Sequence, residues 1–356
     1  MGNLFDYLSW RGDLTFDRSP FRPVDGLILS ALAYVHFGAL VPEGPDAPVP
    51  LGRAAEGYLS LPPARRGRCR CGDDLRLLRA LAEAPRFARL GLCRQADRFV
   101  PREETQFAAL TVLLEDGSAF LAFRGTDGTL VGWKEDFNLS FLDVVPAQLE
   151  AADYVQTFAA GFSGPLRLGG HSKGGNLAVA GAALAGMKAR DQIRSVWSFD
   201  GPGLNAYLLA RPGYSELLTR IRSFVPKSSV VGLLLAHEEP YTVVDSDQDG
   251  LFQHDPYSWQ VQGPGFVRLE EVDPGSRLID RTLKNWLAGL TNAQREAVAD
   301  TLYELLSSGD ATTVKEALEP KNLANALRAA LDADPKDLLT AASSLGRLAG
   351  AALRAL

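Results

Sequence analysis

The sequence has few cysteines, few histidines and no long apolar run, and each shortage excludes a class of protein. Its three cysteines, Cys69, Cys71 and Cys93, are odd in number in a chain of 356 residues. They favour reduced thiols in a cytoplasm over a disulfide framework. No stretch approaches the roughly 18 uninterrupted apolar residues of a transmembrane helix. The first residues lack the apolar core of a secretory signal, which again predicts a cytoplasmic protein.

An excess of basic charge is also absent. The chain has 37 Lys and Arg against 43 Asp and Glu, a formal net charge of -6. It therefore offers no positive field to nucleic acid, and we expect no nucleic-acid partner. Hydrophobic residues make up 46% and charged residues 22%, which is ordinary for a soluble globular protein.

The length exceeds the usual limit of a single core, about 250 to 300 residues. We therefore predict an α/β domain over residues 1–275 and a helical C-terminal extension over 276–356. Strand, helix and strand in that order around residue 170 predict a parallel sheet. In the extension, the pattern from Thr291 to Gln294 predicts a capping box. We expect helices at 24–41, which Asp25 could cap, at 146–162, 176–187 and 338–356, and strands at 107–114, 119–124, 166–169, 193–199, 220–225 and 241–244.

The most informative segment is a short apolar run followed by G-x-S-x-G and an Ala-rich helical stretch. This is the layout of a nucleophile elbow, in which a strand turns sharply into a helix around an exposed serine. Gly170 and Gly174 occupy the positions where larger side chains would collide. The pattern predicts Ser172 as the nucleophile.

A serine nucleophile needs a histidine base, and the chain has four histidines. We expect His36 to lie inside the apolar N-terminal helix and His171 to point away from the serine. Of the other two, His254 is favoured because it sits in a loop after the last expected strand, where this chemistry usually places its base. His237 is the rival.

The base in turn needs a carboxylate, in the chain order Ser, acid, His. Asp200 fits because it follows the strand after the nucleophile strand. Asp245 is the rival acid, and Asp200 could instead cap the next helix. For the oxyanion we predict the backbone amides of Lys173, directly after the serine, and of Thr126, after the strand that ends at Arg124 and Gly125.

These fragments together resemble the fungal-type class 3 lipases, which show F-R-G-[ST], a tryptophan-acidic segment, G-H-S-x-G-G and a distal histidine. The corresponding segments here are LAFRGTD, WKEDF and GHSKGGNLA. The opening MGNLFDYLSWRGDLTF, the elbow, SFDGPG and QHDPYSWQV look more closely like an uncharacterised bacterial family of lipase-like α/β-hydrolases, described as a domain of unknown function. The resemblance implies an α/β-hydrolase fold with helices flanking a mostly parallel sheet.

Two positions depart from the class 3 pattern. Where those lipases carry their acid, in D-[IV]-V-P, this chain has Ser223 before Phe-Val-Pro, so Asp200 has to substitute. Lys173 replaces a small or apolar residue after the serine. Its cation could favour an anionic substrate or bind a carboxylate such as Glu135 or Asp136.

The sequence therefore predicts a serine hydrolase that cleaves carboxylic esters, of lipids or lysophospholipids, through Ser172, His254 and Asp200. The reaction needs no cofactor and no metal. The alternative is an inactive binding or scaffold protein that keeps the fold. The sequence is compatible with a homo-oligomer formed through the C-terminal helices. It is also compatible with transient contact of the protein with a membrane surface.

Overall fold

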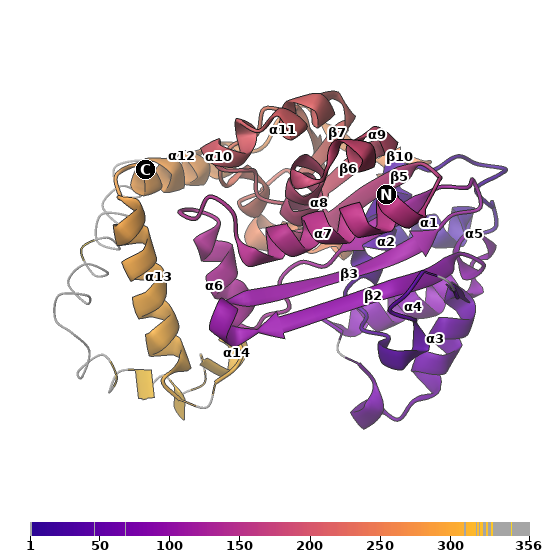
Figure 1. Ribbon diagram of the computed structural model, residues 1–356, viewed down its shortest axis with the longest axis horizontal. Helices are drawn as coiled ribbons and strands as arrows, with labels where there is room; N and C mark the ends of the chain where they lie inside the picture. The colour runs from indigo at the N-terminus through magenta and orange to yellow at the C-terminus, as the bar shows by residue number, and fades with distance from the viewer. Residues whose placement is uncertain are drawn as a thin grey trace. The chain divides into compact units, whose positions relative to one another are not determined.

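The computed structural model describes residues 2–45, 47–67, 69–309 and 311–317, with isolated positions from 319 to 343. The chain divides into two compact units. Figure 1 labels helices and strands of both units. The first comprises Met1–Arg98, Phe107–Gly125 and Ala147–Asp273, and the second comprises Phe99–Gln106, Thr126–Pro146 and Pro274–Leu356. Among the described residues no helix has the length and apolar character needed to cross a membrane.

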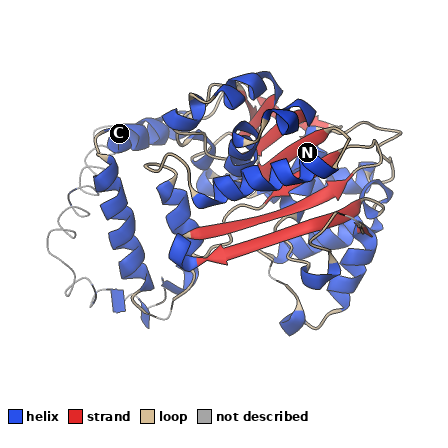
Figure 2. Cartoon of the chain, in the orientation of Figure 1, coloured by secondary structure: helices blue, strands red, loops and turns tan. Residues whose placement is uncertain are grey.

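The described strands form a nine-stranded sheet in the order β1-β2-β3-β4-β5-β6-β7-β8-β11. Figure 2 colours the strands red and the helices blue. Strands β4 to β8 are parallel, whereas β3 pairs with β4 and β11 with β8 in antiparallel fashion. This is the mostly parallel, helix-flanked sheet of the predicted α/β-hydrolase fold. The strands are β1 (Val49–Pro50), β2 (Gly91–Val100), β3 (Thr105–Leu113), β4 (Ala119–Phe123), β5 (Leu166–His171), β6 (Ile193–Phe199), β7 (Ile221–Pro226), β8 (Tyr241–Val244) and β11 (Arg268–Leu269). A separate antiparallel pair joins β9 (Val261–Gln262) to β10 (Gly265–Phe266).

Helices α2 (Pro23–Leu32) and α8 (Lys173–Leu184) both pack against β5. The sequence predicted β3 to β8 to within a few residues, because each is a short apolar run between turn residues, but it did not predict β9, β10 and β11. The predicted helix over 24–41 is wrong in its second half. α2 ends at Leu32, and the chain continues through the 3-10 turn η1 (Gly38–Leu40), with Gly38 at a φ of 58°. A positive φ breaks the helical geometry.

His36 consequently lies outside α2, contrary to the prediction. Its Nδ1 is 2.7 Å from Asp97 Oδ2, and its side chain is 31% exposed. The carboxylate draws the imidazole away from the apolar core, because a charged or hydrogen-bonded partner is worth more to this polar ring than burial without one.

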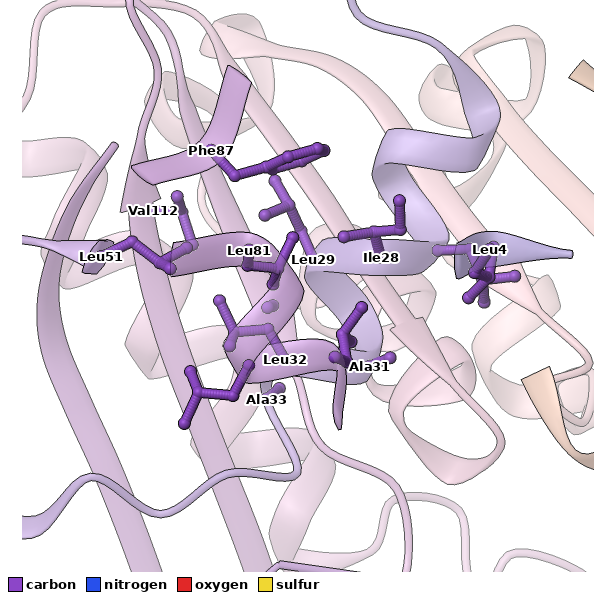
Figure 3. Close-up of a cluster of buried hydrophobic side chains, with 14 of the residues drawn as sticks. Leu4, Ile28, Leu29, Ala31, Leu32, Ala33, Leu51, Leu81, Phe87 and Val112 are labelled. Carbon is purple, nitrogen blue, oxygen red and sulfur yellow. The ribbon is translucent and has the colours of Figure 1, made fainter. Parts of the chain in front are cut away.

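The N-terminal helices of the first unit form one apolar cluster, shown in part in Figure 3. Leu32, Leu51, Leu81 and Phe87 are fully buried within it. These side chains come from the helices α2, α3 (Leu51–Ser60), α4 (Gly72–Glu83) and α5 (Pro85–Ala88). The remaining helices of this unit are α1 (Leu4–Arg11), α7 (Pro146–Gly161), α9 (Met187–Gln192), α10 (Ala206–Leu209) and α11 (Pro212–Leu217).

A buried ion pair fixes these helices. Arg86 and Asp25 are both fully buried, and the guanidinium binds both carboxylate oxygens at 2.8 and 2.6 Å. Tyr7 donates to the same carboxylate at 2.9 Å, and Arg86 also donates to the carbonyls of Leu14 and Ser19. Asp25 in turn accepts the backbone N–H of Arg22 and so helps to cap α2, as predicted.

The second unit contains α6 (Leu130–Asn138), α12 (Pro274–Ala288), α13 (Asn292–Ser307) and α14 (Val314–Ala317). Lys134 on α6 binds Glu104 at 2.7 Å and Asp300 on α13 at 2.8 Å, which joins the three sequence segments of this unit. The capping box at Thr291 and Gln294 is confirmed. The predicted helix over 338–356 lies outside the described residues, except Ser343. The predicted domain division at residue 275 stays a prediction.

Replacing Arg86 by Met should lower the free energy of unfolding by about 3 to 5 kcal/mol, because it leaves the buried Asp25 carboxylate without its cation. Chemical denaturation measures this loss. The matched control is Arg18→Met, whose side chain is 79% exposed, and which should change stability by less than about 0.5 kcal/mol. Equal stability of the two variants would contradict the role of the ion pair.

Candidate active site

Ser172 lies at a sharp turn between β5 and α8. Its φ and ψ are 58° and −135°, a conformation that costs an ordinary residue free energy and that is characteristic of strained functional turns. A Cβ on Gly170 would lie 2.2 Å from the carbonyl of Gly174, and one on Gly174 would lie 2.1 Å from the Phe123 carbonyl oxygen. The elbow therefore requires both glycines, and it leaves the serine partly exposed.

Asp200 is the residue directly after β6, at the same edge of the sheet as Ser172. Its side chain is 1% exposed, and its backbone has a φ of 49°. Asp200 Oδ1 accepts hydrogen bonds from Ser229 Oγ at 2.5 Å and from the Gly232 amide at 3.1 Å. The helix that follows, α10, begins after Asn205, whose own side chain caps it. The alternative that Asp200 caps this helix is therefore wrong.

His254 meets Asp200 through its ring. It ends the 3-10 segment η6 (Gly250–His254), and its Nδ1 is 2.6 Å from Asp200 Oδ2. The His254 side chain is 29% exposed while the carboxylate is buried. A buried carboxylate bound to Nδ1 holds the ring in one orientation and leaves Nε2 as the nitrogen that can take a proton. The structure thus brings together the base and the acid that the sequence favoured.

The rival base, His237, and the rival acid, Asp245, each contact residues other than His254 and Asp200. His237 Nδ1 is 3.1 Å from Glu239 Oε1, and the same carboxylate accepts hydrogen bonds from Tyr214 and Ser223 at 2.7 Å. Ser223, which the sequence resemblance aligned with the acid position of class 3 lipases, is therefore a partner of Glu239. Asp245 Oδ1 accepts the Ser246 amide at 3.0 Å.

The loop that carries His254 is anchored by residues of the QHDPYSW segment to which the sequence pattern alone gave no role. Gln253 Oε1 accepts the Ser228 amide at 2.7 Å, and the indole of the fully buried Trp259 donates to the Gln253 carbonyl at 2.9 Å. Tyr257 donates to the buried Asp74 at 2.8 Å. The signal that could have identified them is the density of polar and aromatic residues in QHDPYSW, because such residues need partners when buried.

The two predicted oxyanion donors belong to different units. Lys173 is the first residue of α8, so its N–H points out of the helix N-terminus beside Ser172. Its side chain is only 1% exposed. Thr126 belongs to the second unit, where its hydroxyl donates to Asp136 at 2.6 Å. Ser172 belongs to the first unit and Thr126 to the second, and each unit is described by itself. The role of the Thr126 amide in binding the oxyanion therefore stays a prediction.

No cluster of three or more His, Cys, Asp or Glu side chains suited to a metal ion occurs in the part of the chain that the structure describes.

Gly125 is a sensitive position because the end of β4 lies close to the elbow. A Cβ there would be 2.3 Å from the Tyr34 hydroxyl and 2.6 Å from the His171 carbonyl oxygen. Gly125→Ala should lower the free energy of unfolding by about 1 to 3 kcal/mol through overpacking. Gly161→Ala is the control, because nothing lies within 4 Å of its added Cβ. Unchanged stability of Gly125→Ala in chemical denaturation would contradict this close approach.

Glu239 should make stability depend on acid pH. Burial alone would raise the pKa of Glu239, but the hydrogen bond and electrostatic attraction of His237, with hydrogen bonds from Tyr214 and Ser223, outweigh burial and lower it from 4.5 to about 2. Because the folded-state pKa is depressed, the stabilisation is present above about pH 4.5 and is lost as the pH falls toward 2. The difference corresponds to about 3 kcal/mol.

Glu239→Gln should therefore unfold more easily at pH 7, by up to about 3 kcal/mol, and should lose less stability than the wild type between pH 4.5 and pH 2. Urea denaturation across this range measures both effects. Glu238→Gln, at the exposed neighbouring position, should behave as the wild type. A Glu239→Gln variant with the wild-type pH profile would show that this carboxylate does not carry the effect.

Comparisons with known proteins find similar solved structures and a sequence family, and the structures include two lipases. A Rhizomucor miehei lipase propeptide complex is 15% identical with a TM-score of 0.36, covering 56% of this chain and 67% of that one. M37 lipase is 17% identical with a TM-score of 0.38, covering 60% and 70%. A mutant form of MDLA from Penicillium cyclopium is 13% identical with a TM-score of 0.38, covering 70% and 86%.

No similar sequence is found among curated proteins. The sequence model of the Mbeg1-like family matches residues 81–304, which include Ser172, Asp200 and His254. The match spans more than half of the chain, and the chain therefore belongs to the Mbeg1-like family.

Proposed function

We propose that the protein is a serine hydrolase that cleaves carboxylic esters through Ser172, His254 and Asp200. The observation that carries the proposal is the 2.6 Å contact between His254 Nδ1 and the buried carboxylate of Asp200, at the sheet edge where Ser172 occupies a strained turn. A histidine oriented by a buried acid beside a serine elbow is the arrangement that activates a hydroxyl for acyl transfer.

In this mechanism Ser172 Oγ attacks the ester carbonyl carbon while His254 Nε2 accepts the hydroxyl proton. Asp200 stabilises the imidazolium that forms. The Lys173 amide stabilises the oxyanion, and the Thr126 amide stays the predicted second donor. His254 then gives its proton to the leaving alkoxide, which leaves an acyl-enzyme. Water attacks this acyl group with His254 again as base, releasing the acid and restoring Ser172.

The substrate class that we propose is an ester with an apolar acyl group, of a lipid or a lysophospholipid. Support comes from Leu251 and Phe252, which precede His254 in η6 and are 67% and 76% exposed. Two large apolar side chains in water beside the base offer an acyl chain a surface to contact, because burying apolar area is favourable.

The test combines a fluorophosphonate probe with p-nitrophenyl esters of increasing acyl length. Ser172→Ala should abolish labelling, and Ser172→Ala and His254→Ala should each lower kcat by about ten-thousandfold or more. Asp200→Asn should lower kcat by about a thousandfold to ten-thousandfold, because the amide no longer holds the imidazole in its working tautomer. Asp245→Asn, at the rival acid, should keep wild-type activity.

A folded wild-type protein that neither reacts with the probe nor hydrolyses any ester would contradict the proposal and favour the binding or scaffold alternative. Loss of activity in Asp245→Asn together with an active Asp200→Asn would instead overturn the acid assignment alone.

A further inference from the structure

His171, the residue before the serine, is buried and contacts the backbone of His254. Its side chain is 1% exposed, and its Nε2 lies 2.7 Å from the main-chain carbonyl oxygen of His254. The two imidazole rings are neighbours, with centroids 4.6 Å apart. The residue next to the nucleophile therefore contacts the backbone of the base across 83 residues of sequence.

The hydrogen-bond network assigns the tautomer of His171. A carbonyl oxygen can only accept, so His171 Nε2 must carry the hydrogen. Nδ1 is then an acceptor, and the Tyr34 hydroxyl lies 3.1 Å from it as a donor, with the His171 carbonyl oxygen as a more distant second acceptor at 3.4 Å. Burial lowers the pKa of His171 well below its usual value, and the nearby His254 and Arg70 lower it further, against the opposing effect of the bond to the His254 carbonyl. His171 is therefore neutral at pH 7.

The Arg70 guanidinium contacts both Tyr34 and the loop that carries His254. The Arg70 guanidinium lies over the Tyr34 ring at 4.6 Å and over the Tyr257 ring at 5.7 Å. It also pairs with Asp74 at 3.6 Å and with Asp255, the residue after His254, at 3.4 Å. Arg70 therefore contacts the segment that follows His254 as well as Tyr34, the partner of His171.

We propose that His171 is a positioning residue for the reaction: its Nε2–H holds the His254 carbonyl, and the Tyr34 hydroxyl holds His171 in the tautomer that can do so. The inference rests on the proposed function. It has a physical reason, because His254 ends a short 3-10 segment whose Leu251 and Phe252 are exposed and give the segment little packing. Asp200 fixes the ring of His254, and Gln253, the residue before it, is anchored by its own hydrogen bonds. The His171 contact acts on the carbonyl of His254 itself.

The first experiment compares two replacements of similar size in the full-length protein. His171→Leu removes the donor, whereas Gln in His171→Gln can place an amide N–H near the position of Nε2. With p-nitrophenyl acetate, His171→Leu should lower kcat by about ten- to a hundredfold with KM nearly unchanged, because a displacement of about 1 Å at the base can cost that much. His171→Gln should recover most of the loss. Tyr34→Phe should fall between the wild type and His171→Leu.

The second experiment does not depend on a variant that folds. Selective ¹⁵N labelling of the four histidines gives a sparse NMR spectrum in which the ring shifts report the tautomer. In the wild type, His171 should be a neutral Nε2–H imidazole at pH 7 and should not titrate near pH 6.5. Far-UV circular dichroism and thermal unfolding establish that each variant is folded.

The outcomes separate the two proposals. An active wild type with an unchanged kcat in folded His171→Leu would overturn the positioning role and leave the proposed function intact. An Nδ1–H or charged His171 at pH 7 would overturn it as well. A loss that His171→Gln does not recover would overturn the role of the donor, because ring packing would then be what His171 contributes. A folded wild type without any esterase activity would overturn the proposed function, and the positioning role with it.

Discussion

The buried carboxylate of Asp200 is the group on which the candidate site depends. A carboxylate that is 1% exposed must be surrounded by donors, because an unpaired buried charge is strongly destabilising. Its donors come from the segment after β7, through Ser229 and Gly232, and from η6, through His254. One side chain at the end of β6 therefore determines where two later loops lie, and the favoured base is one of its partners.

The sheet supplies the geometry that makes this possible. Strands β5 and β6 are parallel neighbours, so the residues that follow them, Ser172 and Asp200, emerge at the same edge. Both have a positive φ, and backbone hydrogen bonds hold them there: the Ser172 amide donates to Phe199 and the Asp200 amide to Phe224. Strained turns of this kind persist only where the surrounding structure imposes them, and they are frequent at functional sites.

The N-terminal third of the chain supplies side chains that contact the residues around the candidate site. Asp25, paired with Arg86, fixes the start of α2, and the chain after that helix carries Tyr34 to His171. Arg70, before α4, reaches Asp255 beside the base. A contact that holds His254 from its carbonyl is independent of the one that Asp200 makes with its ring. Two anchors on different atoms restrict the imidazole more than either does alone, which is the preorganisation that acyl transfer requires.

The sequence by itself determined the central strands and the turn at the serine. Apolar runs between turn residues predicted β5, β6 and β8, and G-x-S-x-G predicted the turn at Ser172, because strand formation and a crowded turn depend on neighbouring residues. It favoured His254 over His237 only by loop position. Only the tertiary structure decided the partners of the histidines. His237 binds Glu239, His36 lies outside α2 and contacts Asp97, and His171 contacts the His254 carbonyl. Such pairings join residues far apart in the chain, or depend on which way a loop folds, so no local pattern specifies them.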